Sequence, residues 1–142
     1  MPVLLKQTLR ASAAAVPDAR RAVQRALTDA GLVDTDLQEA VALTVTEAAS
    51  NVVRHAYPQN PGELQITVTT TRLWLEIGVD DEGVGFQSQD VSQPGAGFGL
   101  RLMRRYARQL CVESGDRGTL VTLRFRLPGG AVRLYGRYGP RS

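Results

Sequence analysis

Residues 73–85 read LWLEIGVDDEGVG, a strand pattern that runs directly into a glycine-rich turn. Because side chains alternate along a strand, one face is shared by Leu73, Leu75, Ile77, Val79 and Asp81. The aliphatic members predict that this face points into a core, so Asp81 continues a buried series. A carboxylate is costly to bury unless a donor binds it. We therefore expect Asp81 to meet a polar ligand, or else to cap the turn, while Asp80 points to solvent.

A second strand pattern, residues 119–127, carries a polar residue on its inward face. Thr119 shares that face with Val121, Leu123, Phe125 and Leu127. If this strand lies beside residues 73–81, then Asp81 and Thr119 converge on one polar ligand.

Two glycine clusters surround the segment that follows Asp81. Gly83 and Gly85 come first, and the segment then ends in Gly95-Ala96-Gly97-Phe98-Gly99, which opens a helix. Glycine permits a close approach of the backbone to a ligand, and the amides of a helix N-terminus suit phosphate oxygens. Each cluster alone is equally compatible with an ordinary turn.

The clearest helix pattern begins at Thr35. Thr35-Asp36-Leu37-Gln38 has the form of a capping box, and Pro58 is expected to end the helix. The apolar stripe that predicts its buried face is Leu37, Val41, Val45, Ala48, Val52 and Ala56.

Glu47 and Asn51 lie four residues apart on this helix, so they occupy one face. Carboxylate and amide oxygens at this spacing can hold Mg²⁺, and a carboxylate can also deprotonate an attacking hydroxyl. By itself such a pair is usually a surface feature. His55 follows one turn later, and we interpret it as a structural hydrogen-bonding residue. Arg101, Arg104, Arg105 and Arg108 form a basic stripe on the next helix, either a solvated face or a contact for nucleotide or an acidic partner.

The remaining patterns complete the architecture. We expect strands near residues 4–9, 64–68 and 111–113, a helix between Pro17 and Gly31, and another helix marked by Leu100, Met103, Ala107 and Leu110. This order predicts an α+β fold, a two-layer sandwich of a mostly antiparallel mixed sheet with its helices on one face. The open face would be polar, with Gln65, Thr67, Glu76, Thr122, Arg124 and Arg126. Trp74 is an apolar exception there, either a contact surface or a residue packed under a loop or tail.

Composition excludes several classes of protein. The chain has 142 residues and a net charge of +3, and residues 128–142 alone contribute three arginines and no acid. We therefore predict one domain over residues 1–127 with a basic, flexible tail over 128–142, and direct nucleic-acid binding is not expected. A single cysteine, Cys111, and a single histidine exclude a disulfide and a zinc cluster. Without a signal peptide or an apolar span, a cytoplasmic protein with no membrane partner is expected. Lys6 is the only lysine, which excludes a Walker-type phosphate loop.

Taken in order, these segments resemble the GHKL (Bergerat) ATPase superfamily. Residues 43–58 look like its N-box, Asp81 to Phe86 match its Asp-x-Gly-x-Gly box, Gly97 to Leu100 match the second glycine box, and Gly118-Thr119 resemble the late-strand box. The ending His55-Ala56-Tyr57 is most similar to bacterial anti-sigma factors with serine kinase activity, of the RsbW and SpoIIAB type.

The resemblance implies a role for each matching residue. Asn51 would ligate Mg²⁺ that bridges the ATP phosphates, Glu47 would be the catalytic base, and Asp81 would accept a hydrogen bond from the adenine 6-amino group. The residues implied to complete the nucleotide site are Gly83 and Gly85 in the adenine pocket, Gly97, Gly99 and Leu100 in the lid, and Thr119 beside Asp81.

The resemblance also implies an activity and partners. ATP would phosphorylate a serine of an anti-anti-sigma protein, and the chain would sequester an RNA polymerase sigma factor, with a homodimer common among relatives. The alternative is an ATP-gated regulatory binding module without phosphotransfer. A histidine-kinase catalytic domain is a third interpretation.

Overall fold

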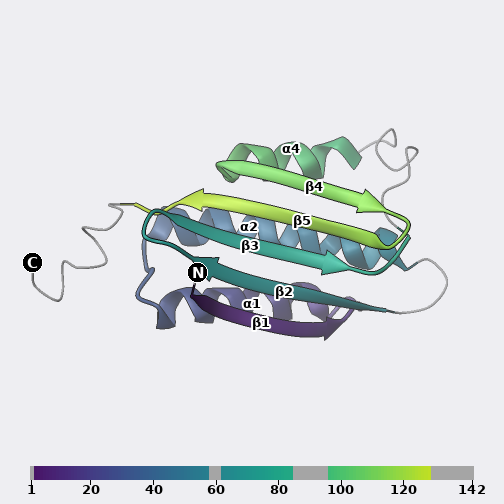
Figure 1. Cartoon of the computed structure of the whole chain (residues 1–142), viewed down its shortest axis with the longest axis horizontal. Coiled ribbons are helices and arrows are strands. Elements are labelled where there is room, and N and C mark those ends of the chain that lie inside the picture. Colours follow the sequence, from purple (N-terminus) through teal and green to yellow (C-terminus); the bar gives the residue numbers. More distant parts are fainter. Residues whose placement is uncertain (1, 58–61, 85–95, 129–142) are drawn as a thin grey trace, which may run out of the picture.

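A computed structural model describes residues 2–57, 62–84 and 96–128 (Figure 1). The elements along the chain are β1 (Val3–Arg10), α1 (Ala15–Asp29), α2 (Thr35–Asn51), the π-helical turn η1 (Val52–Ala56), β2 (Glu63–Thr70), β3 (Trp74–Asp81), α4 (Ala96–Tyr106), β4 (Gln109–Gly115) and β5 (Gly118–Arg126). Among the described residues, no helix has the length and apolar character needed to cross a membrane.

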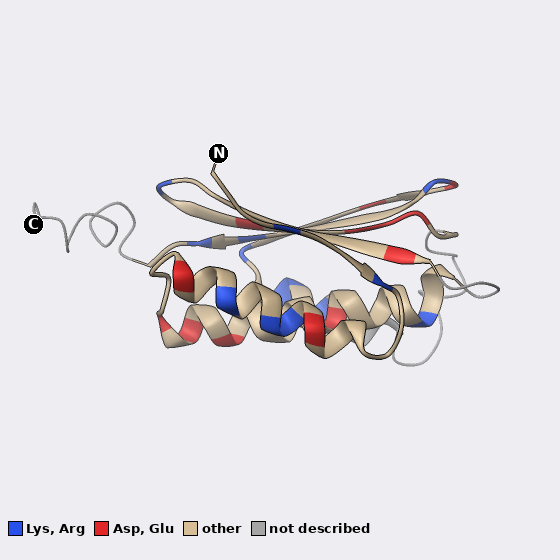
Figure 2. Cartoon of the chain, turned by 90° about the horizontal axis from the view of Figure 1, so that it is seen from below, with Lys and Arg blue, Asp and Glu red and all other residues tan. Residues whose placement is uncertain are grey.

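The strands form a single sheet in the order β1-β2-β3-β5-β4, and each neighbouring pair is antiparallel. Figure 2 shows the helices on one side of this sheet and the other side uncovered. The α+β, two-layer prediction is therefore confirmed. The central position of β3, between β2 and β5, also confirms that the strands carrying Asp81 and Thr119 are neighbours.

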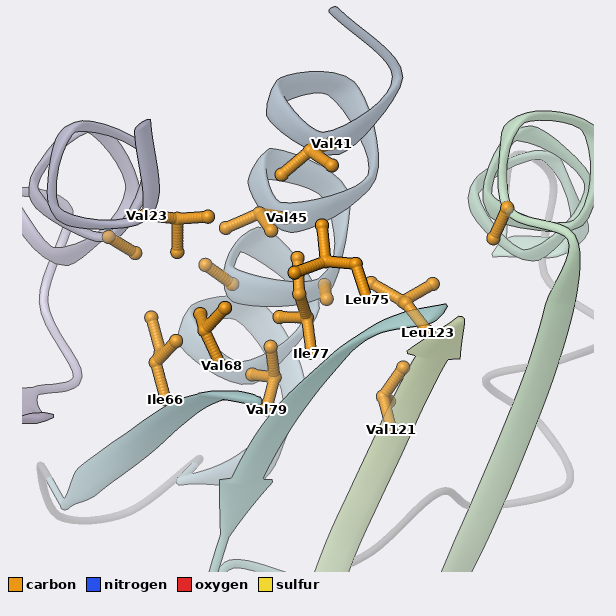
Figure 3. Packing of buried hydrophobic residues seen from close by; sticks show 14 of the residues in the cluster. Val23, Val41, Val45, Ile66, Val68, Leu75, Ile77, Val79, Val121 and Leu123 are labelled. Carbon is orange, nitrogen blue, oxygen red and sulfur yellow. The ribbon is translucent and has the colours of Figure 1, made fainter. Parts of the chain in front are cut away.

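The core lies between the sheet and the helices. Figure 3 shows Leu75, Ile77 and Val79 of β3 on the side of the sheet that faces Val41 and Val45 of α2. Each side chain of this kind contributes about 1.5–3 kcal/mol when fully buried, which explains why strand alternation and helix periodicity fix the two layers. The predicted stripe of α2 and η1 is fully buried: Leu37, Val41, Val45, Ala48, Val52 and Ala56.

The predicted capping box of α2 is wrong, because the cap lies one residue earlier. Asp34 is extended, and its carboxylate accepts a hydrogen bond of 3.0 Å from the Leu37 amide. A carboxylate at a helix N-terminus also interacts favourably with the helix dipole, which a threonine hydroxyl does not. Gln38 instead donates to the Leu32 carbonyl at 2.9 Å and thereby ties the helix to the preceding loop.

Two apolar residues lie outside the elements in which they were predicted. Leu73 precedes β3 in the hairpin turn, where the Thr71 hydroxyl accepts from its amide, and it is 40% exposed. Leu110 belongs to β4 and not to the preceding helix, since α4 ends at Tyr106 and the Arg108 amide already bonds the Arg124 carbonyl of β5. Pro58, predicted to end α2, lies outside the described residues.

Trp74 on the open face is covered by arginines. The Arg124 guanidinium carbon lies 4.3 Å from the centre of its indole ring, and that of Arg126 lies 5.6 Å away. Arg126 is the direct cross-strand partner of Trp74 in β5, so sheet register alone brings these side chains together. On this face the arginines thus cover the indole ring of Trp74 with charged groups.

Candidate nucleotide-binding site

Asp81 and Thr119 lie directly opposite each other where β3 ends and β5 begins, at the right-hand end of the sheet in Figure 1. Both side chains are buried, and Asp81 is only 6% exposed, whereas Asp80 is exposed. The Thr119 hydroxyl is in turn hydrogen-bonded to the Ser114 hydroxyl of β4 at 2.8 Å. The inward placement of Asp81 and its pairing with Thr119 are therefore confirmed.

Burial raises the pKa of the Asp81 carboxyl above the ordinary aspartate value, and hydrogen bonds from the backbone amides of Gly83 and Thr119 partly oppose this rise. The Gly83 amide lies 2.9 Å from Asp81 Oδ1. Two amide donors do not fully compensate a buried charge, so the carboxylate retains acceptor capacity for a ligand.

The raised pKa of Asp81 predicts how stability depends on pH. The folded chain binds a proton at Asp81 more tightly than the unfolded chain does, so this group lowers the free energy of unfolding as pH rises from the ordinary aspartate pKa through the raised one. Asp81→Asn has no ionisable group at this position, so its free energy of unfolding does not fall with pH for this reason. We expect urea unfolding to show Asp81→Asn gaining stability relative to wild type between pH 4 and pH 7. A difference that is constant across this range would contradict the prediction.

A small cavity separates this strand pair from α2 and η1. Its volume is about 20 Å³, and it is lined by Ala48, Asn51, Val52, His55, Ala56, Asp81, Thr119 and Val121. That is about the space of one water molecule. A planar base would therefore fit against these residues only if the cavity widened. The cavity joins Asn51 to Asp81 and Thr119, which the residue patterns alone left as separate motifs and the resemblance implied to lie in one nucleotide site. It also includes His55, for which only a structural role was predicted.

The turn after β3 is fixed against the end of η1. The Val84 amide donates to the Ala56 carbonyl at 2.9 Å, and a side chain at Gly83 would overlap that carbonyl. The Tyr57 hydroxyl donates to the Glu63 carbonyl at 2.6 Å and accepts from the Glu82 amide at 2.9 Å. Tyr57 thus connects the start of β2 to the end of β3. Gly83 is required for the close approach of the turn to the Ala56 carbonyl. Gly85 lies outside the described residues.

Glu47 and Asn51 are connected by a residue that the sequence analysis did not single out. Arg54 Nη2 lies 3.1 Å from Glu47 Oε2 and 3.0 Å from Asn51 Oδ1. The three residues follow the helical spacing i, i+4 and i+7, which places them on one face. Extending the Glu47–Asn51 pair by three positions would have identified Arg54.

The N-terminal part of α4 packs against Glu47. A side chain at Gly99 would place its Cβ 2.5 Å from Glu47 Oε2, so any larger residue there would require the Glu47 side chain to shift. Gly97 lies in the first turn of the same helix, and Leu100 is half-buried against the core. The second glycine cluster therefore opens a helix, as predicted, and Gly99 brings that helix to Glu47.

The donor set is compatible with Mg²⁺ only in the presence of further ligands. No group of three or more histidine, cysteine, aspartate or glutamate side chains with metal-site geometry occurs in the described ranges. Asn51 Oδ1 offers one oxygen at the cavity, and Mg²⁺ is commonly bound through one or two protein oxygens plus waters and substrate phosphates. A metal held by Asn51 and a polyphosphate fits these residues.

A second hollow lies beyond Tyr57, on the other side of the turn. It has a volume of about 350 Å³, and Glu63, Asp80 and Glu82 contribute carboxylates to its lining. Desolvation and the neighbouring Glu82 raise the pKa of Asp80. This concentration of negative charge disfavours a phosphate, so the smaller cavity at Asn51 and Asp81 is the better candidate despite its size.

A known domain family matches most of the chain. The histidine kinase-like ATPase domain family matches residues 9–125. The sensor histidine kinase PdtaS of Mycobacterium tuberculosis is 29% identical over 104 residues, which cover 68% of this chain and 21% of PdtaS. The chain thus spans about a fifth of the length of the curated relatives it matches.

Solved structures share the fold. The RsbU and RsbW domains of Rv1364c from Mycobacterium tuberculosis superpose with a TM-score of 0.69 at 22% identity, covering 89% of this chain and 33% of that one. The histidine kinase domain of the Erythrobacter litoralis EL346 blue-light activated histidine kinase gives a TM-score of 0.59 at 18% identity, covering 82% of this chain and 64% of that one.

Proposed function

Because the chain belongs to the histidine kinase-like ATPase domain family, we propose that it is an ATP-dependent serine kinase that phosphorylates an anti-anti-sigma protein and also sequesters a sigma factor. The observation that carries the enzymatic part is the placement of Glu47, a partly exposed carboxylate one helical turn from Asn51 and in contact with α4. A domain that only binds nucleotide has little need for a carboxylate at this point.

Adenine recognition is assigned to Asp81. Its carboxylate accepts a hydrogen bond from the 6-amino group of adenine, with Thr119 beside it, while Gly83 and Gly85 shape the pocket. A guanine base presents a carbonyl oxygen at the equivalent position, and an ionised carboxylate cannot donate to it. Asp81 therefore selects ATP over GTP.

Asn51 and the α4 residues Gly97, Gly99 and Leu100 would hold the phosphates. Asn51 would also hold Mg²⁺, which would supply charge neutralisation at the phosphate oxygens. Glu47 takes the proton from the serine hydroxyl of the partner as that oxygen bonds the γ-phosphorus and the bond to ADP breaks. Serine phosphate and ADP are the products.

The partner assignment rests on the RsbW-type structural neighbour and on the ending His55-Ala56-Tyr57. We also propose that the protein is cytoplasmic and forms a homodimer. The division into a domain over residues 1–127 and a basic tail over 128–142 stays a proposal, and residues beyond Pro128 lie outside the described ranges.

Transfer of label from [γ-³²P]ATP to a partner tests the proposal. We expect the purified chain, incubated with Mg²⁺ and candidate anti-anti-sigma domains, to label one of them on a serine, as identified by phosphopeptide mapping. A partner with that serine replaced by alanine is the control. ATP binding without label in any partner would exclude the kinase.

That result would favour a second function, an ATP-gated binding module. The observation in its favour is the ion pair between Arg54 and Glu47, which occupies the proposed base. Sigma-factor capture that depends on ATP but leaves ATP intact would identify such a module.

A further inference from the structure

One nitrogen atom of Arg54 contacts both proposed functional oxygens of α2. Nη2 lies 3.1 Å from Glu47 Oε2 and 3.0 Å from Asn51 Oδ1, so a positively charged group already occupies the space between them. Arginine is protonated at any physiological pH, so this charge is permanent. The guanidinium therefore contacts the Asn51 oxygen to which a metal ion would bind.

The two cations compete for Asn51. Mg²⁺ binds oxygen at about 2.0–2.1 Å with near-octahedral geometry. An amide oxygen has two lone pairs, but Nη2 contacts both Asn51 Oδ1 and Glu47 Oε2, so a metal ion between these two oxygens would meet the guanidinium. Repulsion between a divalent ion and a guanidinium a few ångströms away therefore favours departure of Arg54 when the metal binds.

Arg54 is able to leave, whereas Glu47 is held in place. The Arg54 side chain is 58% exposed, so it can rotate into solvent without opening a cavity in the core. The Glu47 side chain is 20% exposed and lies against Gly99 of α4. Departure of Arg54 would leave the Glu47 carboxylate in place without its ion-pair partner.

We propose that Arg54 is a displaceable cation that competes with the divalent metal for Asn51 and restrains Glu47 until the metal arrives. Arg54 is a positioning residue, and it couples release of the proposed base to metal binding. This inference rests on the Mg²⁺–ATP site of the proposed function, and it does not require phosphate transfer to a serine.

The test measures how much Mg²⁺ the chain needs to bind ATP. Calorimetric titration of ATP over a series of free Mg²⁺ concentrations, and in EDTA, is compared for wild type, Arg54→Met and Arg21→Met. Methionine keeps an unbranched stem but removes the charge. Arg21 is the control because its side chain is about as exposed as that of Arg54, 65% against 58%, and it forms an ion pair with Asp18 at 2.7 Å on α1. Thermal unfolding checks that the variants are folded.

Arg54→Met is expected to lower the half-saturating Mg²⁺ concentration about three- to tenfold, the size expected from loss of one partly exposed, charge-assisted contact. ATP affinity in EDTA should stay within about twofold, and Arg21→Met should match wild type. An unchanged Mg²⁺ requirement would overturn the inference. Weaker ATP binding in EDTA would overturn it as well, because Arg54 would then be a phosphate ligand. If the Mg²⁺ requirement shifts as expected but no partner is labelled, only the proposed kinase is lost.

Discussion

Asp81→Asn is expected to weaken ATP binding about 10- to 100-fold while the fold stays at least as stable at pH 7. A hydrogen bond to a charged group contributes about 1.5–3 kcal/mol, and the substitution removes the charge while keeping the shape. The buried carboxylate that costs stability in the absence of a ligand is the group that we propose as the adenine contact. Calorimetry with ATP and thermal unfolding measure the two effects on the same samples.

Asp80→Asn is the control for this variant, because Asp80 is adjacent in sequence but points to the opposite face of β3. Its ATP affinity should remain within about twofold of wild type. GTP binding provides an additional readout. Because an asparagine amide can donate to the guanine carbonyl, the ratio of ATP affinity to GTP affinity should decrease in Asp81→Asn. Equal loss of ATP affinity in both variants would mean that Asp81 does not contact the base.

Glu47→Gln is expected to retain ATP binding within a few-fold and to lose phosphate transfer by about 10²–10⁴-fold, the usual contribution of a general base. Glutamine has the shape of glutamate and can still accept the hydrogen bond from Arg54, so the geometry at Asn51 should be kept. Single-turnover transfer of label to the partner serine measures the chemical step separately from binding.

Glu39→Gln, on the exposed surface of the same helix, serves as the matched control and should transfer phosphate at the wild-type rate. If Glu47→Gln keeps more than about a tenth of the wild-type rate, Glu47 is not the base. If it instead loses ATP affinity in parallel with transfer, its role is in binding.

Strand alternation and helix periodicity were sufficient to predict most of the fold. From Leu75 onward the inward series ending in Asp81 was correct, and so was the buried stripe of α2, because burial of aliphatic side chains decides both. The errors concern element ends, where local polar groups compete. Asp34 displaced Thr35 as the helix cap, and Leu110 lies in β4 because the ladder with β5 begins as soon as α4 ends.

The candidate site was predicted as separate residues, and the structure supplied the contacts between them. The alternation of side chains along the two strands predicted that Asp81 and Thr119 lie side by side. The cavity that joins them to Asn51 depends on how α2 packs across the sheet, which no local pattern encodes. Arg54 was missed because an arginine on an exposed helix face has no distinguishing sequence signal until its spacing from Glu47 and Asn51 is considered.

The π-helical turn η1 makes the end of α2 sensitive to chain length. A π turn holds one more residue than an α turn, and here it aligns the Ala56 carbonyl with the Val84 amide and the Tyr57 hydroxyl with the Glu82 amide. Deleting one residue would rotate everything beyond it by about 100°, the angle between successive α-helical residues. Homologous chains should therefore tolerate substitutions between Val52 and Ala56 far better than single-residue insertions or deletions.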